Sequence, residues 1–159
     1  MKNEIIKIST NRQNYEIALK PCDRGRDEKF IRELTKENCF NYLNNTIGWD
    51  EARHGREPKF PERYRMLFHN NNCIGFICLK EQSNCLYINT LQLIKQYRRQ
   101  GIGTKLLQFI EDIARKKAKD KIQLRVIDGN PALSLYRRHG FRVIEDLEWC
   151  LLMEKTVNI

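Results

Sequence analysis

The chain has 159 residues, of which 41% are apolar and 9% aromatic, and its formal net charge is +9. This length suits one domain with a sheet covered by helices, and the composition excludes a disordered chain. No run of about 18 apolar residues occurs, so no membrane helix is expected, and the first residues are too polar for a secretory signal. We therefore expect a single domain over residues 1–159, located in the cytoplasm.

The positive charge is spread along the chain, with local pairs at Arg98–Arg99 and Arg137–Arg138. No nucleic-acid-binding motif accompanies it, so nucleic acid is not expected as a partner, and an anionic cofactor explains part of the charge at least as well. The six cysteines include no C-x-x-C pair, and the three histidines are scattered. That spacing predicts neither disulfides nor a metal site.

The first third of the chain predicts one strand and one long helix. Alternating residues at 15–20 predict the strand, and residues 27–43 predict a helix with an apolar inner face. Four-residue steps from Leu34 continue that face to Asn38 and Tyr42. These two side chains either face a wet cleft or lie at an exposed helix end.

The next segment predicts three strands in a meander. Residues 63–68 and 73–79 flank an asparagine-rich turn, which is typical of a hairpin, and residues 85–93 follow as the third strand. His69 at the turn is expected to be solvated. Trp49, in the polar segment before the meander, is more readily a core anchor than a wall of a substrate cleft.

The stretch Arg98–Thr104 joins the strand at 85–93 to an amphipathic helix. The first amides of a helix have no partner within it, and the helix dipole adds partial positive charge there. Gly101 and Gly103 have no side chain to keep a phosphate from those amides, and two arginines add charge at the entrance. The stretch is not a Walker loop, because it lacks Gly-Lys followed by Ser or Thr after a longer glycine spacing. It is not a dinucleotide fingerprint, because Leu106 stands where a third glycine is needed.

The last third predicts a strand, a short helix and a strand pair. Residues 122–127 are expected to run parallel to 85–93, because a helix lies between the two strands in sequence. The short helix has Asn130 as its N-cap and Gly140 just beyond its end. Two closing strands are expected at residues 141–144 and 149–153.

Two motifs in this order resemble the GNAT superfamily of N-acetyltransferases. They are R-x-x-G-x-G from Arg98 to Gly103 and N-x-A-x-x-L-Y-x-x-x-G-F from Asn130 to Phe141. The resemblance implies an α/β (α+β) fold with a mixed, mostly antiparallel central sheet flanked by helices. It also implies that the parallel strands at 90–93 and 122–127 splay apart at their C-terminal ends.

The same resemblance implies a donor and a reaction. The donor is acetyl-CoA, and its acetyl group goes to a primary amine of a small molecule, a peptide or a protein. The pantetheine arm would pair with the main chain near Leu91 and Leu93, and the pyrophosphate would lie on amides of the glycine loop. The implied donor-binding residues are Leu91, Leu93, Arg98, Arg99, Gln100, Gly101, Ile102, Gly103, Thr104, Asn130 and Arg137.

Tyr136 is the candidate catalytic residue. A phenol, with an ordinary pKa of about 10, is protonated at neutral pH and can donate a proton to the departing thiolate. The alternative is that Tyr136 only packs. No general base is evident, because the strand before the glycine loop offers amide and hydroxyl groups where some family members have a glutamate. Either a water connects the amine to Glu37 or Glu51, or the amine enters neutral.

The sequence also leaves a second function and the oligomeric state open. The absence of a glutamate base motivates the alternative of a non-catalytic acyl-CoA-binding sensor or interaction module on the same fold. The closing strands are candidates for a homodimer contact.

Overall fold

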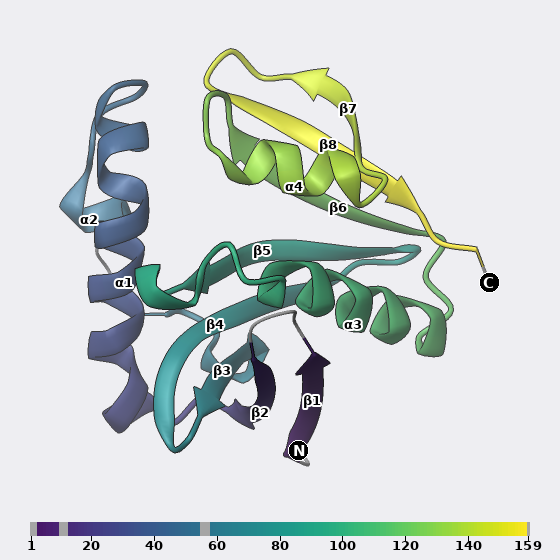
Figure 1. Ribbon diagram of the computed structural model, residues 1–159. Helices are drawn as coiled ribbons and strands as arrows, with labels where there is room; N and C mark the ends of the chain where they lie inside the picture. Colours follow the sequence, from purple (N-terminus) through teal and green to yellow (C-terminus); the bar gives the residue numbers. More distant parts are fainter. Residues whose placement is uncertain (1–2, 10–12, 55–57, 159) are drawn as a thin grey trace. The chain divides into compact units, whose positions relative to one another are not determined.

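A computed structural model describes residues 3–9, 13–54 and 58–158 and shows a sheet flanked by helices (Figure 1). The strands are hydrogen-bonded in the order β1-β2-β3-β4-β5-β6-β8-β7. The β5–β6 pair is parallel, and β1–β2, β2–β3, β3–β4, β6–β8 and β7–β8 are antiparallel. The predicted fold class, a mixed and mostly antiparallel sheet, is confirmed.

The chain divides into two compact units. Unit 1 comprises Met1–Cys78 and Thr90–Ile102, and unit 2 comprises Leu79–Asn89 and Gly103–Ile159. None of the helices among the described residues is long and apolar enough to cross a membrane.

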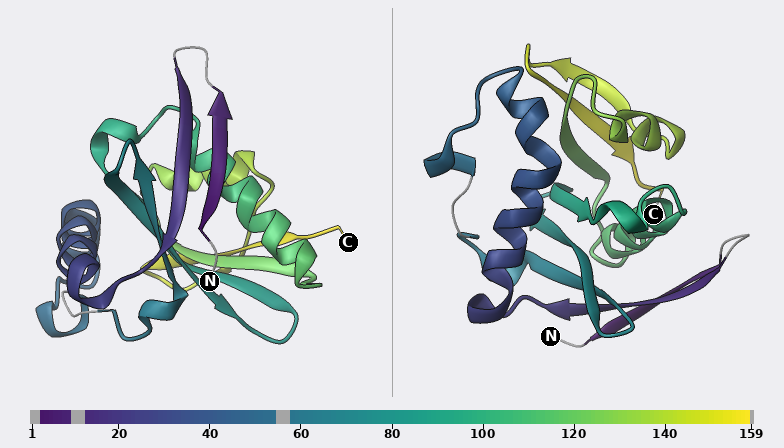
Figure 2. Two further views of the ribbon diagram at one scale, coloured as in Figure 1. Left: turned by 90° about the horizontal axis from the view of Figure 1, so that it is seen from below. Right: turned by 60° about the vertical axis from the view of Figure 1, so that its left-hand side comes forward.

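Unit 1 begins with two antiparallel strands, β1 (Glu4–Ser9) and β2 (Asn14–Pro21), which Figure 2 shows as a long ribbon. The sequence did not predict β1, because its residues are mostly exposed and Ile8 alone is fully buried. β3 (Tyr64–His69) and β4 (Asn72–Glu81) form the predicted hairpin. Left-handed backbone at Asn70 and Asn71 makes its turn.

Helix α1 (Arg24–Asn44) covers the strands of unit 1. It begins where the Asp23 side chain accepts a hydrogen bond from the amide of Arg26 at 3.1 Å, an N-cap that satisfies one of the first helical donors. Its buried residues Ile31 and Leu34 pack with the strand residues Met66 and Phe76. The remaining helical segments of unit 1 are short: α2 (Glu51–His54), η1 (Pro61–Arg63) and η2 (Lys95–Tyr97).

β4 approaches the end of β5 (Cys85–Leu93) very closely at Gly75. A Cβ atom at Gly75 would lie 2.1 Å from the carbonyl oxygen of Gln92 and 3.1 Å from the Cα of Leu93. Only glycine fits here, because both neighbours are main-chain atoms that cannot rotate away.

Unit 2 contains the parallel pair. Its register runs from Cys85↔Lys121 to Ile88↔Leu124, and both strands continue past it, β5 to Leu93 and β6 to Ile127. The other elements are β6 (Lys121–Ile127), β7 (Arg142–Asp146), β8 (Cys150–Thr156), α3 (Ile102–Lys116) and α4 (Ala132–Arg138). β6, β7 and β8 lie within three residues of their predicted bounds, and α4 lies between the predicted Asn130 and Gly140.

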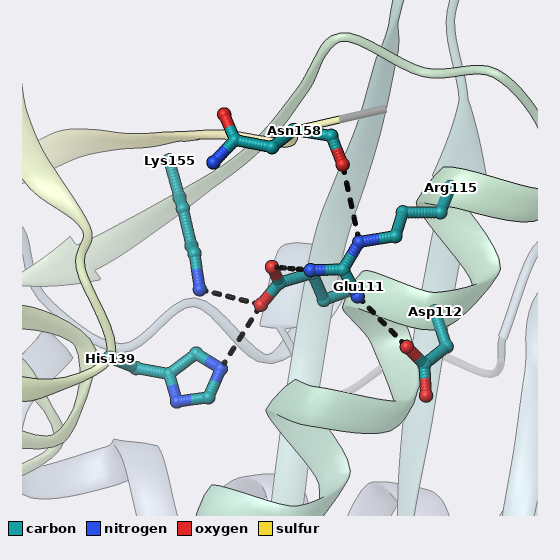
Figure 3. A network of polar contacts seen from close by, with 6 residues as sticks. All are labelled: Glu111, Asp112, Arg115, His139, Lys155 and Asn158. Atoms are coloured by element: carbon teal, nitrogen blue, oxygen red, sulfur yellow. Dashed lines mark hydrogen bonds and ion pairs between the residues drawn. The ribbon is translucent and has the colours of Figure 1, made fainter.

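Glu111 on α3 links α3 to β8 and to the end of α4 (Figure 3). Its carboxylate accepts a hydrogen bond from Lys155 at 2.5 Å, contacts Arg115, and lies 3.6 Å from Nε2 of His139. The side chain of Glu111 is only 13% exposed, although its position on α3 between basic residues suits an outer face. The cations around it explain how a carboxylate is tolerated there.

His139 is expected to make the protein less stable in mild acid. Burial and the charge of Lys155 lower the pKa of His139 below its ordinary value of 6.5, and together they outweigh the opposing effect of Glu111. The unfolded chain therefore takes up a proton on this residue more readily than the folded chain. The stabilisation is complete above about pH 6.5 and is lost as the pH falls below it. His139→Gln should thus lose less Tm than the wild type between pH 7.5 and 5.5; equal losses would contradict this.

Candidate functional site

The segment between β5 and α3 is a tightly curled loop. Arg99 has φ +60° and Gly101 has φ +81°, two left-handed residues within three positions. Such backbone is costly for a non-glycine residue, and strain of this kind concentrates at functional sites. The helix starts at Ile102, whose side chain is fully buried and fixes the first turn. The amides of that turn have no partner within the helix.

The side chain of Arg98 is exposed, yet it is hydrogen-bonded to neighbouring parts of unit 1. Its Nε donates a 3.0 Å hydrogen bond to the carbonyl oxygen of Leu93, and its Nη2 donates to Oδ1 of Asn38 on α1. Asn38 in turn donates through Nδ2 to Oε1 of Gln92 at 2.8 Å and to the Leu93 carbonyl at 3.3 Å. Asn38 is therefore not at a frayed helix end, since α1 continues to Asn44, and it links α1, β5 and the loop.

Gln92 occupies the strand position at which a base was considered. Its Nε2 donates to the Thr90 hydroxyl at 2.9 Å and to Sγ of Cys39 at 3.6 Å. Both ends of the amide are thus engaged in hydrogen bonds within unit 1. Burial raises the pKa of the Cys39 thiol, although Gln92 and Arg98 oppose the shift.

A second set of contacts holds Gln100. Its Oε1 accepts a hydrogen bond from the hydroxyl of Tyr15 on β2, and its Nε2 donates to the Gln96 carbonyl at 2.6 Å. The Tyr15 ring packs edge-on against His69 and Tyr97, with centroids 5.2 and 6.0 Å away. His69 Nδ1 and the Tyr97 hydroxyl are hydrogen-bonded at 2.8 Å. The expectation that His69 is solvated was wrong, since only 8% of it is exposed.

The second motif lies on α4 in unit 2. The N-cap of α4 is Pro131, one residue after the predicted Asn130, but the Asn130 side chain accepts a 2.9 Å hydrogen bond from the amide of Ala132. Tyr136 is buried, and its ring packs edge-on against Phe141 at 5.8 Å. The two motifs meet at Gly103, because a Cβ atom there would lie 3.0 Å from Cδ2 of Leu135. Gly103 therefore lets α3 and α4 pack closely.

A sequence profile described as the Acetyltransferase (GNAT) family matches residues 29–141, which is more than half of the chain. The chain belongs to this family.

Individual relatives agree with the assignment. The chain is 33% identical over 93 residues to the probable N-acetyltransferase san of Drosophila melanogaster, covering 55% of this chain and 50% of that protein. It is 34% identical over 90 residues to N-alpha-acetyltransferase 50 of Danio rerio, covering 53% of this chain and 54% of that protein. The chain thus spans about half the length of the curated relatives it matches.

The GNAT fold is also found among solved structures. The PaiA N-acetyltransferase of Thermoplasma acidophilum, solved in complex with coenzyme A, matches with a TM-score of 0.70 and 22% identity. The match covers 88% of this chain and 98% of that chain. It shows that the two proteins share a fold.

The acidic residues considered as bases in this GNAT domain are at the surface. Glu51 accepts hydrogen bonds from Nε1 of Trp49 at 2.6 Å and from Lys36 at 3.3 Å. The Trp49 bond, followed by that of Lys36, lowers the pKa of Glu51, which makes it a weaker base. Trp49 is not a core anchor: it is half-buried and packs against the exposed Phe40 at 5.6 Å. Glu37 is exposed.

No group of three or more His, Cys, Asp or Glu side chains within 3–9, 13–54 and 58–158 is arranged to hold a metal ion. Sequence reasoning missed the parts played by Asn38, Gln92 and Tyr15. One signal was present for Asn38, namely a polar residue at helical spacing on an apolar stripe. Nothing in the motif itself points to Tyr15.

Proposed function

We propose that this chain transfers the acetyl group of acetyl-CoA to a primary amine, with the α-amine of a peptide as the favoured acceptor. The observation that carries the proposal is the curled loop before α3, with left-handed Arg99 and Gly101, in a chain that belongs to the GNAT family. The peptide acceptor is favoured by the Danio rerio relative, whose name is N-alpha-acetyltransferase 50.

The loop suits the pyrophosphate of the donor. The proposed ligands are the main-chain amides from Arg99 to Thr104, at the positive end of the α3 dipole. Arg99 is exposed and makes no hydrogen bond or ion pair with the rest of the described chain, so its guanidinium is available to an anion. Asn130 and Arg137 are proposed for the pantetheine region and the nucleotide end.

The pantetheine arm would pair with the last residues of β5. The carbonyl oxygen of Leu93 already accepts hydrogen bonds from Arg98 and Asn38. A carbonyl oxygen has two lone pairs, so its acceptor capacity is filled. Leu91 is therefore the better candidate of the two for a main-chain carbonyl contact.

Tyr136 is proposed as the proton donor to the thiolate that leaves when the amine attacks the thioester. No carboxylate is assigned as the general base. The β5 position at which a base was considered holds Gln92, and its amide is already hydrogen-bonded to Asn38 and Thr90. Loss of the amine proton is left to water, or the acceptor binds in its neutral form.

The test is release of CoA thiol from acetyl-CoA across an amine panel. The panel holds a peptide with a free N-terminus, the same peptide blocked at its N-terminus and carrying one lysine, spermidine, and an aminoglycoside. We expect release with the free peptide to exceed that with the blocked peptide by about 10-fold, a discrimination of about 1.4 kcal/mol.

Thermal unfolding separates the enzyme from a sensor of the same fold. Acetyl-CoA at 100 times its Kd should stabilise the folded protein by about 2.7 kcal/mol, and so raise Tm by roughly 5–10 °C. A raised Tm without thiol release from any amine would identify a non-catalytic acyl-CoA-binding module. An unchanged Tm together with no thiol release would overturn the donor as well.

A further inference from the structure

The arginine of the R-x-x-G-x-G motif, Arg98, is exposed but is hydrogen-bonded to the protein itself. Its guanidinium holds the Leu93 carbonyl and the Asn38 side chain, which belong to the two elements beside the loop. We propose that Arg98 and Asn38 are positioning residues that fix the glycine loop on β5 and α1. This rests on the proposed function, because the loop is taken to bind acetyl-CoA.

Asn38 has the chemistry that this junction needs. One end of its amide donates to Gln92 and to the Leu93 carbonyl, while the other accepts from Arg98. An asparagine can donate and accept at once, whereas an aspartate would bring negative charge to the Leu93 carbonyl. The residue is half-buried in α1, so its bonds to Gln92 and to the Leu93 carbonyl are partly shielded from competing water.

Arg98 is held by geometry that a lysine does not reproduce. The planar guanidinium directs Nε to one acceptor and Nη2 to another, in a fixed fork. A lysine in its place has one donor atom at the end of a flexible stem and would not reach both acceptors with the same geometry. The adjacent Arg99 has no such partners within the described residues, so its whole guanidinium is available to an anion.

The arrangement makes the donor loop depend on α1. Leu93 is the last residue of β5, and Arg98 begins the curl that ends at Ile102. Substituting either Asn38 or Arg98 breaks the hydrogen bonds that join α1, β5 and the loop. The two substitutions should therefore weaken donor binding through one shared event and not through two separate losses.

The experiment is a double-mutant cycle on Asn38→Ala and Arg98→Lys, measuring Kd for acetyl-CoA and the kinetic constants. Each single variant should weaken acetyl-CoA binding about 10-fold, the loss expected for one or two hydrogen bonds. The double variant should also lose about 10-fold, where independent effects would give about 100-fold. The KM for acetyl-CoA should rise accordingly, while kcat stays within about 3-fold of the wild type.

Two further variants serve as references. Asn41→Ala makes the same change on an exposed residue three positions along α1 and should leave donor affinity unchanged. Arg99→Ala should weaken binding and reduce its dependence on salt, as expected for a charge that meets a phosphate. Wild-type affinity in Arg98→Lys, or effects of Asn38→Ala and Arg98→Lys that simply multiply, would overturn the proposal.

Hydrogen exchange on the ligand-free protein tests the same inference without any activity. The amides of residues 99–105 should exchange about 10-fold faster in Asn38→Ala and in Arg98→Lys than in the wild type or Asn41→Ala. Unchanged exchange there would contradict the positioning role even if the donor were not acetyl-CoA. Absence of a thermal shift in the wild type would instead count against the proposed function alone.

Discussion

Replacing Tyr136 with phenylalanine is expected to lower kcat about 100-fold while leaving the affinity for acetyl-CoA unchanged. The substitution keeps the ring, which packs edge-on against Phe141 at 5.8 Å, and removes only the hydroxyl. General acid catalysis by a positioned side chain typically contributes about 10²–10⁴-fold, so the loss should appear in turnover and not in binding. The measurement is steady-state thiol release, together with a binding titration of acetyl-CoA.

Tyr64→Phe is the matched reference for this change. Tyr64 is also a mostly buried tyrosine packed against a phenylalanine, Phe76, with centroids 5.7 Å apart, but it lies in the unit 1 core. Loss of the Tyr64 hydroxyl should leave kcat within about 2-fold of the wild type, since no proton transfer is assigned to that group. If Tyr136→Phe behaved like Tyr64→Phe, the hydroxyl of Tyr136 would have no part in the chemistry.

Replacing Gly75 with alanine is expected to destabilise the protein by about 3 kcal/mol, or roughly 6–12 °C in Tm. The added Cβ would lie 2.1 Å from the Gln92 carbonyl oxygen, so β4 or β5 must shift. Because Gln92 and Leu93 also hold Asn38, the shift should weaken acetyl-CoA binding as well.

Gly25→Ala provides a control of the opposite sign. Gly25 lies in the first turn of α1, and its nearest neighbour to an added Cβ is Oδ1 of Asp23 at 3.8 Å, an ordinary contact. Alanine is the better helix former, so this variant should gain about 0.5–1 kcal/mol. A Gly75→Ala variant with wild-type Tm would contradict the predicted destabilisation, because β4 and β5 would then move apart at residue 75 with no loss of stability.

The elements nearest the two motifs were predictable because local rules agree on them. For α3, a strong period of 3.6 follows a glycine loop, and for α4 a side-chain cap and the left-handed Gly140 mark the two ends. The strand at Cys85–Leu93 was predicted with its observed bounds. The parallel pairing of β5 with β6 followed from the helix between them.

The sequence missed β1 and misplaced His69, because neither shows its structure in a local pattern. β1 has too few buried residues to show alternation, and His69 reads as a turn residue until Tyr15 and Tyr97 pack around it. The motif predicts the positive charge of Arg98 but not which group its side chain contacts, because a guanidinium can donate hydrogen bonds to a phosphate or to an amide oxygen. Which of them it meets depends on Asn38, and no local pattern connects those two residues.

The contacts that hold the glycine loop reach far back along the chain. Arg98 meets a residue 60 positions earlier, and Gln100 meets one 85 positions earlier. Such non-local contacts close long segments and form late in folding. A fragment of residues 85–141 would contain both motifs but would lack Asn38 and Tyr15, the residues that hold the loop. During synthesis Tyr15 and Asn38 leave the ribosome before the glycine loop does. The loop can therefore form its contacts with these residues as soon as it emerges.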